Sequence, residues 1–348
     1  MVLLRYAKIK FRLKRSQQYH ISSVQFLEIS ARINYFCGTL YQYVMPIRLK
    51  GILFASIAAI LWGFLAIALK VSLRSFSPIE ISWIRFVIAF SVLAGYYALF
   101  DPKSFSIFRK PPITLLLAGI SLGLNYLGFI TGIHYTTPGI AQVFIQLGPI
   151  FLTLAAFIIF KEKASIKQVI GLIIALTGLS LFYHEQLSVL IVDVQIFNKG
   201  IVWVIFGALC WACFAILQKR LVIKHPPMQL NLIVFGLPAL LYIPFVQFEK
   251  FANISAGYIL LLIFLGLNTL GAYGSLAFAL KYLEANKISV ILIQNPVITF
   301  IALFFLNQME VTWIDGERFT LLTIVGAVMV IAGGVLTVFI DKKNKPAS

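Results

Sequence analysis

Long apolar runs, each ended by a short polar stretch, make up most of the chain. An α-helix needs about 20 apolar residues to cross the hydrocarbon core of a bilayer, and most of these runs have that length. The connections are short, and several contain proline, as at Pro111-Pro112 and Pro226-Pro227. Ten transmembrane helices are therefore predicted, near residues 51–70, 80–99, 113–133, 138–160, 166–184, 200–219, 229–248, 256–280, 285–306 and 319–340.

One heptapeptide occurs twice with a single change, as LGLNYLG at 122–128 and LGLNTLG at 265–271. Other matches follow in the same order, and Trp62 corresponds to Trp211. Apolar sequence produces chance similarity easily. A shared heptapeptide centred on asparagine, with tryptophan in register, nevertheless indicates that one unit was duplicated.

The number of spans determines how the two copies face the membrane. Each copy holds five spans, so the second enters the bilayer from the side opposite to the first. The predicted fold is an all-α integral membrane protein whose ten transmembrane helices form two inverted five-helix repeats, at residues 49–184 and 199–340. In proteins built this way, the substrate site lies near the middle of the bilayer between the repeats.

Residues 1–48 precede the repeats and form a basic extension that begins MVLLRYAKIKFRLKRS. Two interpretations stay open. The extension is either an amphipathic segment that lies in the membrane interface or sequence upstream of a true start at Met45. It lacks the long apolar core and the small-residue cleavage site of a cleaved signal peptide.

Composition supports a membrane environment and excludes an ordinary soluble domain. The 348 residues are 60% hydrophobic and 12% charged, whereas soluble domains are about 45–50% apolar and about 25% charged. A polar cytoplasmic enzyme is therefore excluded, and the lipid bilayer is an expected partner.

The distribution of positive charge predicts the orientation. A formal net charge of +17 would indicate nucleic-acid binding in a soluble protein. If the N-terminus is cytoplasmic, however, the loops and tails on the opposite side receive only Lys70, Arg74, Lys199, Lys250 and Arg318. This asymmetry follows the positive-inside rule. Both termini are predicted to be cytoplasmic, and no nucleic-acid partner is expected.

Motifs for catalysis or metal binding are weak in this sequence. Cys210 and Cys213 form a CxxC within an apolar run, with no second pair and no nearby histidine, so a packing role is favoured over zinc. The sequence contains no P-loop motif and no cluster of His, Asp and Cys at the end of a span. We expect neither an enzyme nor a bound cofactor or metal.

Polar and aromatic residues inside the spans are candidates for a substrate cavity, because polar groups in lipid are costly unless they face the bundle interior or water. The candidates are Trp62, Arg85, Asn125, Gln142, Gln146, Trp211, Asn268, Tyr273, Gln294 and Asn295. For each, a packing role is the alternative. Asparagine bonds across helices, tryptophan packs in cores, and the glutamines satisfy backbone groups that Pro149 and Pro296 leave free.

Arg85 is the cation placed well inside a span. It could attract a substrate carboxylate near the outer mouth of a cavity. Two alternatives are that it snorkels to the outer surface or pairs with Glu80. All 12 acids lie at span ends, in loops or in tails. We therefore expect facilitated movement down a gradient, or coupling through Glu80 or Glu284.

Several stretches resemble the EamA unit of the drug/metabolite transporter (DMT) superfamily. In the first copy they are SFSPIEISWIRFVIAF (75–90) and FKEKASIKQVIGLIIALTGLSLF (160–182). In the second copy they are KYLEANKISVILIQNPVITF (281–300) and GAVMVIAGGVLTV (326–338). The resemblance covers about residues 50–340.

This resemblance implies a secondary transporter of the cytoplasmic membrane that exports or permeates amino acids, metabolites or related small molecules. Two alternatives remain: a scaffold or receptor without transport, and a transporter of nucleosides or drugs. The monomer and the homodimer are both open. Two features depart from the family pattern: the second copy has no equivalent of Arg85, and extra residues from Trp313 to Arg318 precede the last span.

Overall fold

The structure, a computed structural model, describes residues 46–136, 138–163, 165–184, 194–252, 254–309, 311 and 320–339. Helices dominate these residues, which include no strand, and the predicted all-α class is confirmed. The N-terminal extension up to residue 45 and the extra residues from Trp313 to Arg318 lie outside the described ranges. Contacts divide the chain into residues 1–49 and 50–348, and the following paragraphs concern the second unit.

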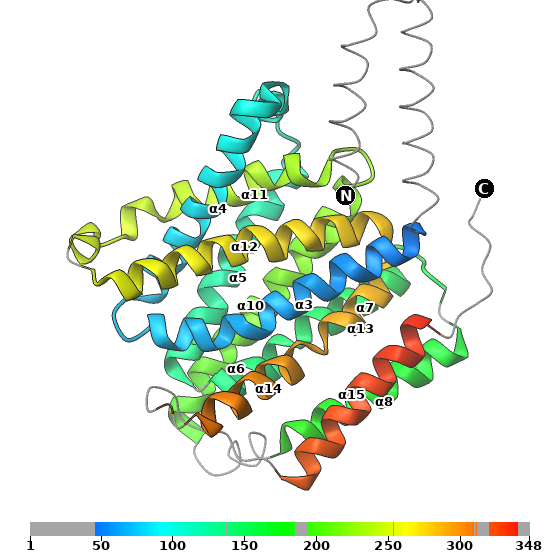
Figure 1. The fold of residues 1–348 in the computed structure, drawn as a ribbon. Helices are drawn as coiled ribbons and strands as arrows, with labels where there is room; N and C mark the ends of the chain where they lie inside the picture. The colour runs from blue at the N-terminus through cyan, green and yellow to red at the C-terminus, as the bar shows by residue number, and fades with distance from the viewer. Residues whose placement is uncertain are drawn as a thin grey trace, which may run out of the picture. The chain divides into compact units, whose positions relative to one another are not determined.

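The first half of the chain supplies six α-helices (Figure 1): α3 (Ile47–Ser72), α4 (Pro78–Phe100), α5 (Ile113–Tyr135), α6 (Pro138–Ile145), α7 (Leu147–Ile158) and α8 (Ile166–Phe182). The second half supplies α10 (Val194–Leu221), α11 (Pro227–Tyr242), α12 (Ala256–Tyr282), α13 (Ala285–Leu292), α14 (Asn295–Gln308) and α15 (Leu321–Phe339). Short 3₁₀ helices lie at Pro102–Phe108, Ile243–Phe245 and Phe248–Phe251.

Each predicted span coincides with one helix or with two consecutive helices. Among the described residues, 7 helices are long and apolar enough to cross a membrane, judged by length and composition. Three shorter apolar helices accompany them, at Leu147–Ile158, Ile166–Phe182 and Leu321–Thr337. The chain is therefore a multi-pass membrane protein.

Two predicted spans are broken in the same way. The fourth span divides into α6 and α7 at Gln146, and the ninth divides into α13 and α14 just before Asn295. Proline lacks an N–H and clashes with the carbonyl four residues earlier, so a helix breaks in the turn before it. Pro149 lies in the turn that follows the break at Gln146, and Pro296 lies directly after Asn295, where α14 begins. Broken helices at membrane depth are tolerated where they line a cavity.

Glycines allow α5 and α10 to approach closely. A Cβ atom on Gly128 would lie 2.7 Å from the Cα of Gly207 and 2.7 Å from the carbonyl oxygen of Trp203. Small residues at a crossing allow the backbones to pack, which is how helices associate where lipid removes the hydrophobic driving force.

The helix pair α8 and α15 uses the same device (Figure 1). The first glycine of α8, Gly171, packs against the carbonyl of Gly333, and the second, Gly178, packs against that of Gly326. Because the earlier glycine of one helix contacts the later glycine of the other, the two helices are antiparallel.

The α5–α10 contact generates a prediction about stability. Gly128→Ala should destabilise the protein by about 1–3 kcal/mol, because the new methyl group overlaps backbone that cannot move independently. Thermal unfolding in detergent measures the effect. Gly95→Ala is the matched control, since a Cβ on Gly95 of α4 meets nothing within 4 Å. Equal loss of stability in the two variants would contradict the proposed packing role.

Candidate functional site

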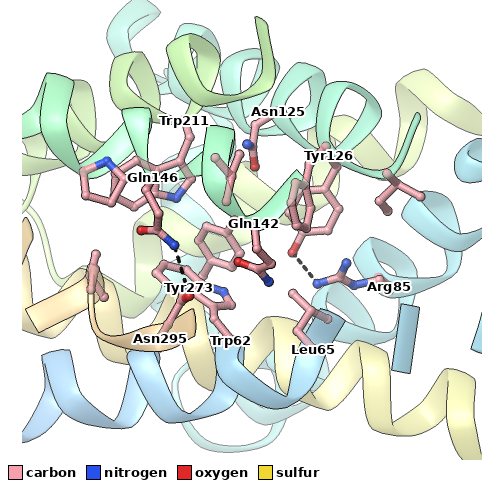
Figure 2. Close-up of a pocket in the computed structure, with 15 residues that line it drawn as sticks. Trp62, Leu65, Arg85, Asn125, Tyr126, Gln142, Gln146, Trp211, Tyr273 and Asn295 are labelled. Carbon is pink, nitrogen blue, oxygen red and sulfur yellow. Dashed lines mark hydrogen bonds between the residues drawn. The ribbon is translucent and has the colours of Figure 1, made fainter. Parts of the chain in front are cut away.

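A pocket lies among helices of both halves of the chain and holds roughly 600 Å³ of space that no atom fills, part of which is open to solvent. Its lining combines aromatic rings, amides and one guanidinium (Figure 2). The lining residues are Trp62, Leu65, Arg85, Asn125, Tyr126, Phe129, Ile130, Gln142, Ile145, Gln146, Pro149, Trp211, Tyr273, Leu292 and Asn295.

Most residues that were predicted to line a cavity meet here. They are Trp62, Arg85, Asn125, Gln142, Gln146, Trp211, Tyr273 and Asn295. The other two candidates, Asn268 and Gln294, are not among the lining residues. Substrate binding by these lining residues remains a prediction.

Arg85 is buried in α4, with 1% of its surface exposed. Its Nε donates a hydrogen bond to Thr269 Oγ1 at 3.0 Å, and its Nη2 donates one to Tyr126 Oη at 3.2 Å. The guanidinium carbon also lies 4.4 Å from the centre of the Tyr126 ring, within the range of a cation–π interaction. Arg85 therefore does not snorkel to the surface.

Glu80 has a different partner from the one considered in the sequence. Its carboxylate accepts the N–H of Ser77, and Ser77 in turn caps the first turn of α4, which is a capping box. The same carboxylate forms an ion pair with Lys250 at 3.1 Å. The alternative in which Arg85 pairs with Glu80 was wrong, because the cap and Lys250 hold the carboxylate at the helix end.

The partners of Arg85 also bond to each other. Tyr126 Oη donates to Thr269 Oγ1 at 3.2 Å, and Thr269 Oγ1 donates to the carbonyl of Leu265 at 2.9 Å. Tyr126 and Thr269 are the one mismatched pair of the repeated heptapeptide. Sequence reasoning named Arg85 but missed Thr269, although that mismatch was a visible signal.

Aromatic rings from three helices form another wall of the cavity. Trp62 and Trp211 meet edge to face, with centroids 6.0 Å apart and planes at 77°. Tyr273 lies 5.2 Å from Trp62 at 68°. Such geometry stabilises aromatic packing, so these rings both pack together and present apolar surface to the cavity.

The broken helices contribute the amides (Figure 2). Gln146 Nε2, at the α6–α7 break, donates to Asn295 Oδ1, at the start of α14, over 3.2 Å. The buried Oε1 of Gln142 on α6 has no hydrogen-bond partner among the described residues. The cavity therefore contains an acceptor that a ligand or a water molecule has to satisfy.

The two heptapeptide asparagines have equivalent structural roles. Asn125 Nδ2 donates to the carbonyl of Gly207 on α10 at 2.9 Å, and Asn268 Nδ2 donates to that of Leu61 on α3 at 2.7 Å. Each joins its helix to a helix of the other half, as expected for polar side chains in membrane helix packing. Gln294 instead packs against Gly334 of α15.

A helical membrane protein with a pocket of polar and aromatic side chains between its two halves has the architecture typical of membrane transporters. A model of the EamA-like transporter family matches residues 49–184 and 198–339. The chain belongs to this family, and therefore to the DMT superfamily of transporters.

Curated relatives cover most of the chain. It is 32% identical over 291 residues to the uncharacterized inner membrane transporter YhbE of Escherichia coli K12, covering 82% of this chain and 90% of YhbE. An uncharacterized transporter of Haemophilus influenzae is 29% identical over 291 residues, or 83% of this chain and 94% of that protein. A probable amino-acid metabolite efflux pump of Salmonella typhimurium is 25% identical over 300 residues, or 82% and 93%.

One solved crystal structure shares the fold, with a TM-score of 0.66 over 83% of this chain and 97% of that one. The two sequences are 15% identical, so the likeness concerns the fold alone.

The hydrogen bond from Arg85 to Thr269 predicts that substitutions of these two residues have non-additive effects on stability. Thr269→Val should destabilise the protein by about 1–3 kcal/mol, because a buried charged donor loses its acceptor. Arg85→Met with Thr269→Val should cost less than the sum of the two single changes, since the charged donor that loses its acceptor in Thr269→Val is then absent. Thermal unfolding of the four proteins gives the coupling energy. Strict additivity would show that the hydroxyl does not support the guanidinium.

Proposed function

We propose that this protein is a secondary transporter that moves small metabolites, such as amino acids or related amphiphilic compounds, across the cytoplasmic membrane by alternating access. The observation that carries the proposal is the polar and aromatic cavity at which side chains from both halves of a transporter-family chain meet. The name of the Salmonella relative, an amino-acid metabolite efflux pump, supports the substrate class and export as the direction.

The proposed architecture is a pair of inverted five-helix repeats related by a twofold axis in the membrane plane. Residues near such an axis meet their own counterparts. Trp62 packs on Trp211, and Tyr126 bonds to Thr269, and both pairs occupy matched positions of the repeats. The glycines through which α8 and α15 pack antiparallel also occupy matched positions of the repeats. These contacts support the inverted repeat.

Alternating access requires contacts that close one end of the cavity and can be released. Glu162, which follows α7, accepts the N–H groups of Ala285 at 2.9 Å and Asn286 at 3.1 Å, at the start of α13. Charge-assisted bonds to a helix N-terminus are strong. They join the first half to the second at one end of the bundle, and we propose that they break when that end opens.

The proposed driving force is the substrate gradient. No Asp or Glu is among the described residues that line the cavity. Coupling to protons through Glu80 or Glu284 is the alternative, and both carboxylates already have lysine partners, Lys250 and Lys287 respectively.

Flux through the cavity should depend on the amide pair. Gln146→Leu or Asn295→Leu should lower counterflow of radiolabelled leucine in proteoliposomes by about tenfold, the effect of a barrier raised by about 1.4 kcal/mol. Each variant leaves the other amide unpaired in the cavity while the helices stay packed. Gln247→Leu, at an exposed position in the connection before α12, should leave flux unchanged. Full flux in both cavity variants would contradict the proposed path, and absence of flux in the wild type would favour a receptor or scaffold.

The proposed topology places both termini in the cytoplasm. Small epitope tags at either end should resist protease in intact spheroplasts and become accessible after permeabilisation. A tag in the loop between α11 and α12 should be cleaved without permeabilisation. Termini found in different compartments would rule out an even number of spans.

A further inference from the structure

Arg85 carries a charge that no described acidic side chain neutralises. The described ion pairs join Lys250 to Glu80 and Lys287 to Glu284, whereas the guanidinium bonds to two neutral hydroxyls. A buried cation without an anion is unfavourable, and in a membrane span it marks a functional site. An anion bound in the cavity would provide the missing charge.

The hydroxyl partners leave part of the guanidinium for a ligand. The proton of Tyr126 Oη is directed to Thr269, and that of Thr269 to the Leu265 carbonyl, so both hydroxyls act as acceptors toward Arg85. Their bonds to Arg85 engage Nε and Nη2, and a guanidinium has five N–H donors. Arg85 lines the cavity, and its planar fork matches a carboxylate through two parallel bonds.

Gln142 adds a second requirement. Its side chain points into the same space as Arg85 (Figure 2), and 5% of the residue is exposed. Its Oε1 has no hydrogen-bond partner among the described residues. An unpaired acceptor that lines the same cavity as the guanidinium favours a ligand that carries a hydrogen-bond donor as well as an anionic group.

We propose that the transported ligand carries a carboxylate bound by Arg85 and a neighbouring ammonium or other N–H donor bound by Gln142, with its apolar part against Trp62 and Trp211. This assignment rests on the proposed transport function and narrows its substrate class to α-amino acids and molecules that share their head group. Nucleosides and cationic drugs lack the carboxylate and are excluded as preferred ligands.

Binding of three related probes to the purified full-length protein in nanodiscs tests the assignment at pH 6.5. L-leucine has both head groups, 4-methylpentanoate has the carboxylate alone, and L-leucine methyl ester has the ammonium alone. Tryptophan fluorescence reports binding, because Trp62 and Trp211 line the cavity. Leucine should bind at least tenfold more tightly than the ester, with 4-methylpentanoate between them. An ester that binds as tightly as leucine, or binding by none of the three, would overturn the proposal.

Two variants test whether Arg85 binds the carboxylate and whether Gln142 binds the ammonium. Arg85→Gln should weaken leucine binding at least tenfold and abolish the preference for leucine over its ester. Gln142→Leu should abolish the preference for leucine over 4-methylpentanoate and keep that over the ester. Arg220→Gln, which removes an exposed charge at the end of α10, should change neither. A folded Arg85→Gln protein with unchanged leucine affinity would overturn the role of Arg85.

The wild-type probe series decides the ligand class even if Arg85→Gln does not fold. Flux measurements then separate this assignment from the proposed function. Leucine-selective binding without counterflow in proteoliposomes would remove the transport function and leave the ligand site. Counterflow that does not discriminate between leucine and its ester would overturn the ligand assignment and leave transport intact.

Discussion

The lack of water in the hydrocarbon core constrains every part of this structure. Backbone N–H and C=O groups must bond within the protein, which restricts the spans to helices and permits breaks only where a cavity is lined. Polar side chains follow the same constraint. Asn125 and Asn268 reach the backbone of a neighbouring helix, and Arg85 is held by the hydroxyls of Tyr126 and Thr269. The polar positions of the spans therefore mark both the helix crossings and the cavity.

The cavity is asymmetric at a point where the two heptapeptides otherwise agree. The two copies of the heptapeptide provide the same asparagine to helix packing, and their single mismatch provides a phenol on one side and a small hydroxyl on the other. Together these hold the guanidinium of α4, for which the second half has no equivalent. The matched asparagines of the two heptapeptides thus serve packing, and the unmatched Tyr126 and Thr269 hold the charge of the cavity.

The helices and most of the cavity lining could be predicted because each leaves a signal within a short stretch of sequence. Apolar run length gives the spans, and Trp62, Gln142 and Gln146 are unusual residues for mid-span positions. The heptapeptide mismatch marks Tyr126 and Thr269, but their contact with Arg85 could not be predicted, because the three residues come from α4, α5 and α12, which are separated along the chain. Gln294 shows the opposite error. It directly precedes Asn295 near the same proline, yet its side chain faces α15. Neighbouring positions of a helix point in different directions, so a shift of one residue decides whether a side chain lines the cavity or packs against another helix.

A positive charge within a bilayer has an electrical consequence as well as a chemical one. Arg85 lies inside a membrane-spanning helix, so any rearrangement that changes its access from one aqueous side to the other moves charge through the membrane field, worth about 2.3 kcal/mol per elementary charge per 100 mV. A zwitterionic amino acid adds no net charge to the site, so the empty and occupied forms of such a carrier would both move this charge through the field. The membrane potential would then bias the loaded step as well as the return of the unloaded protein.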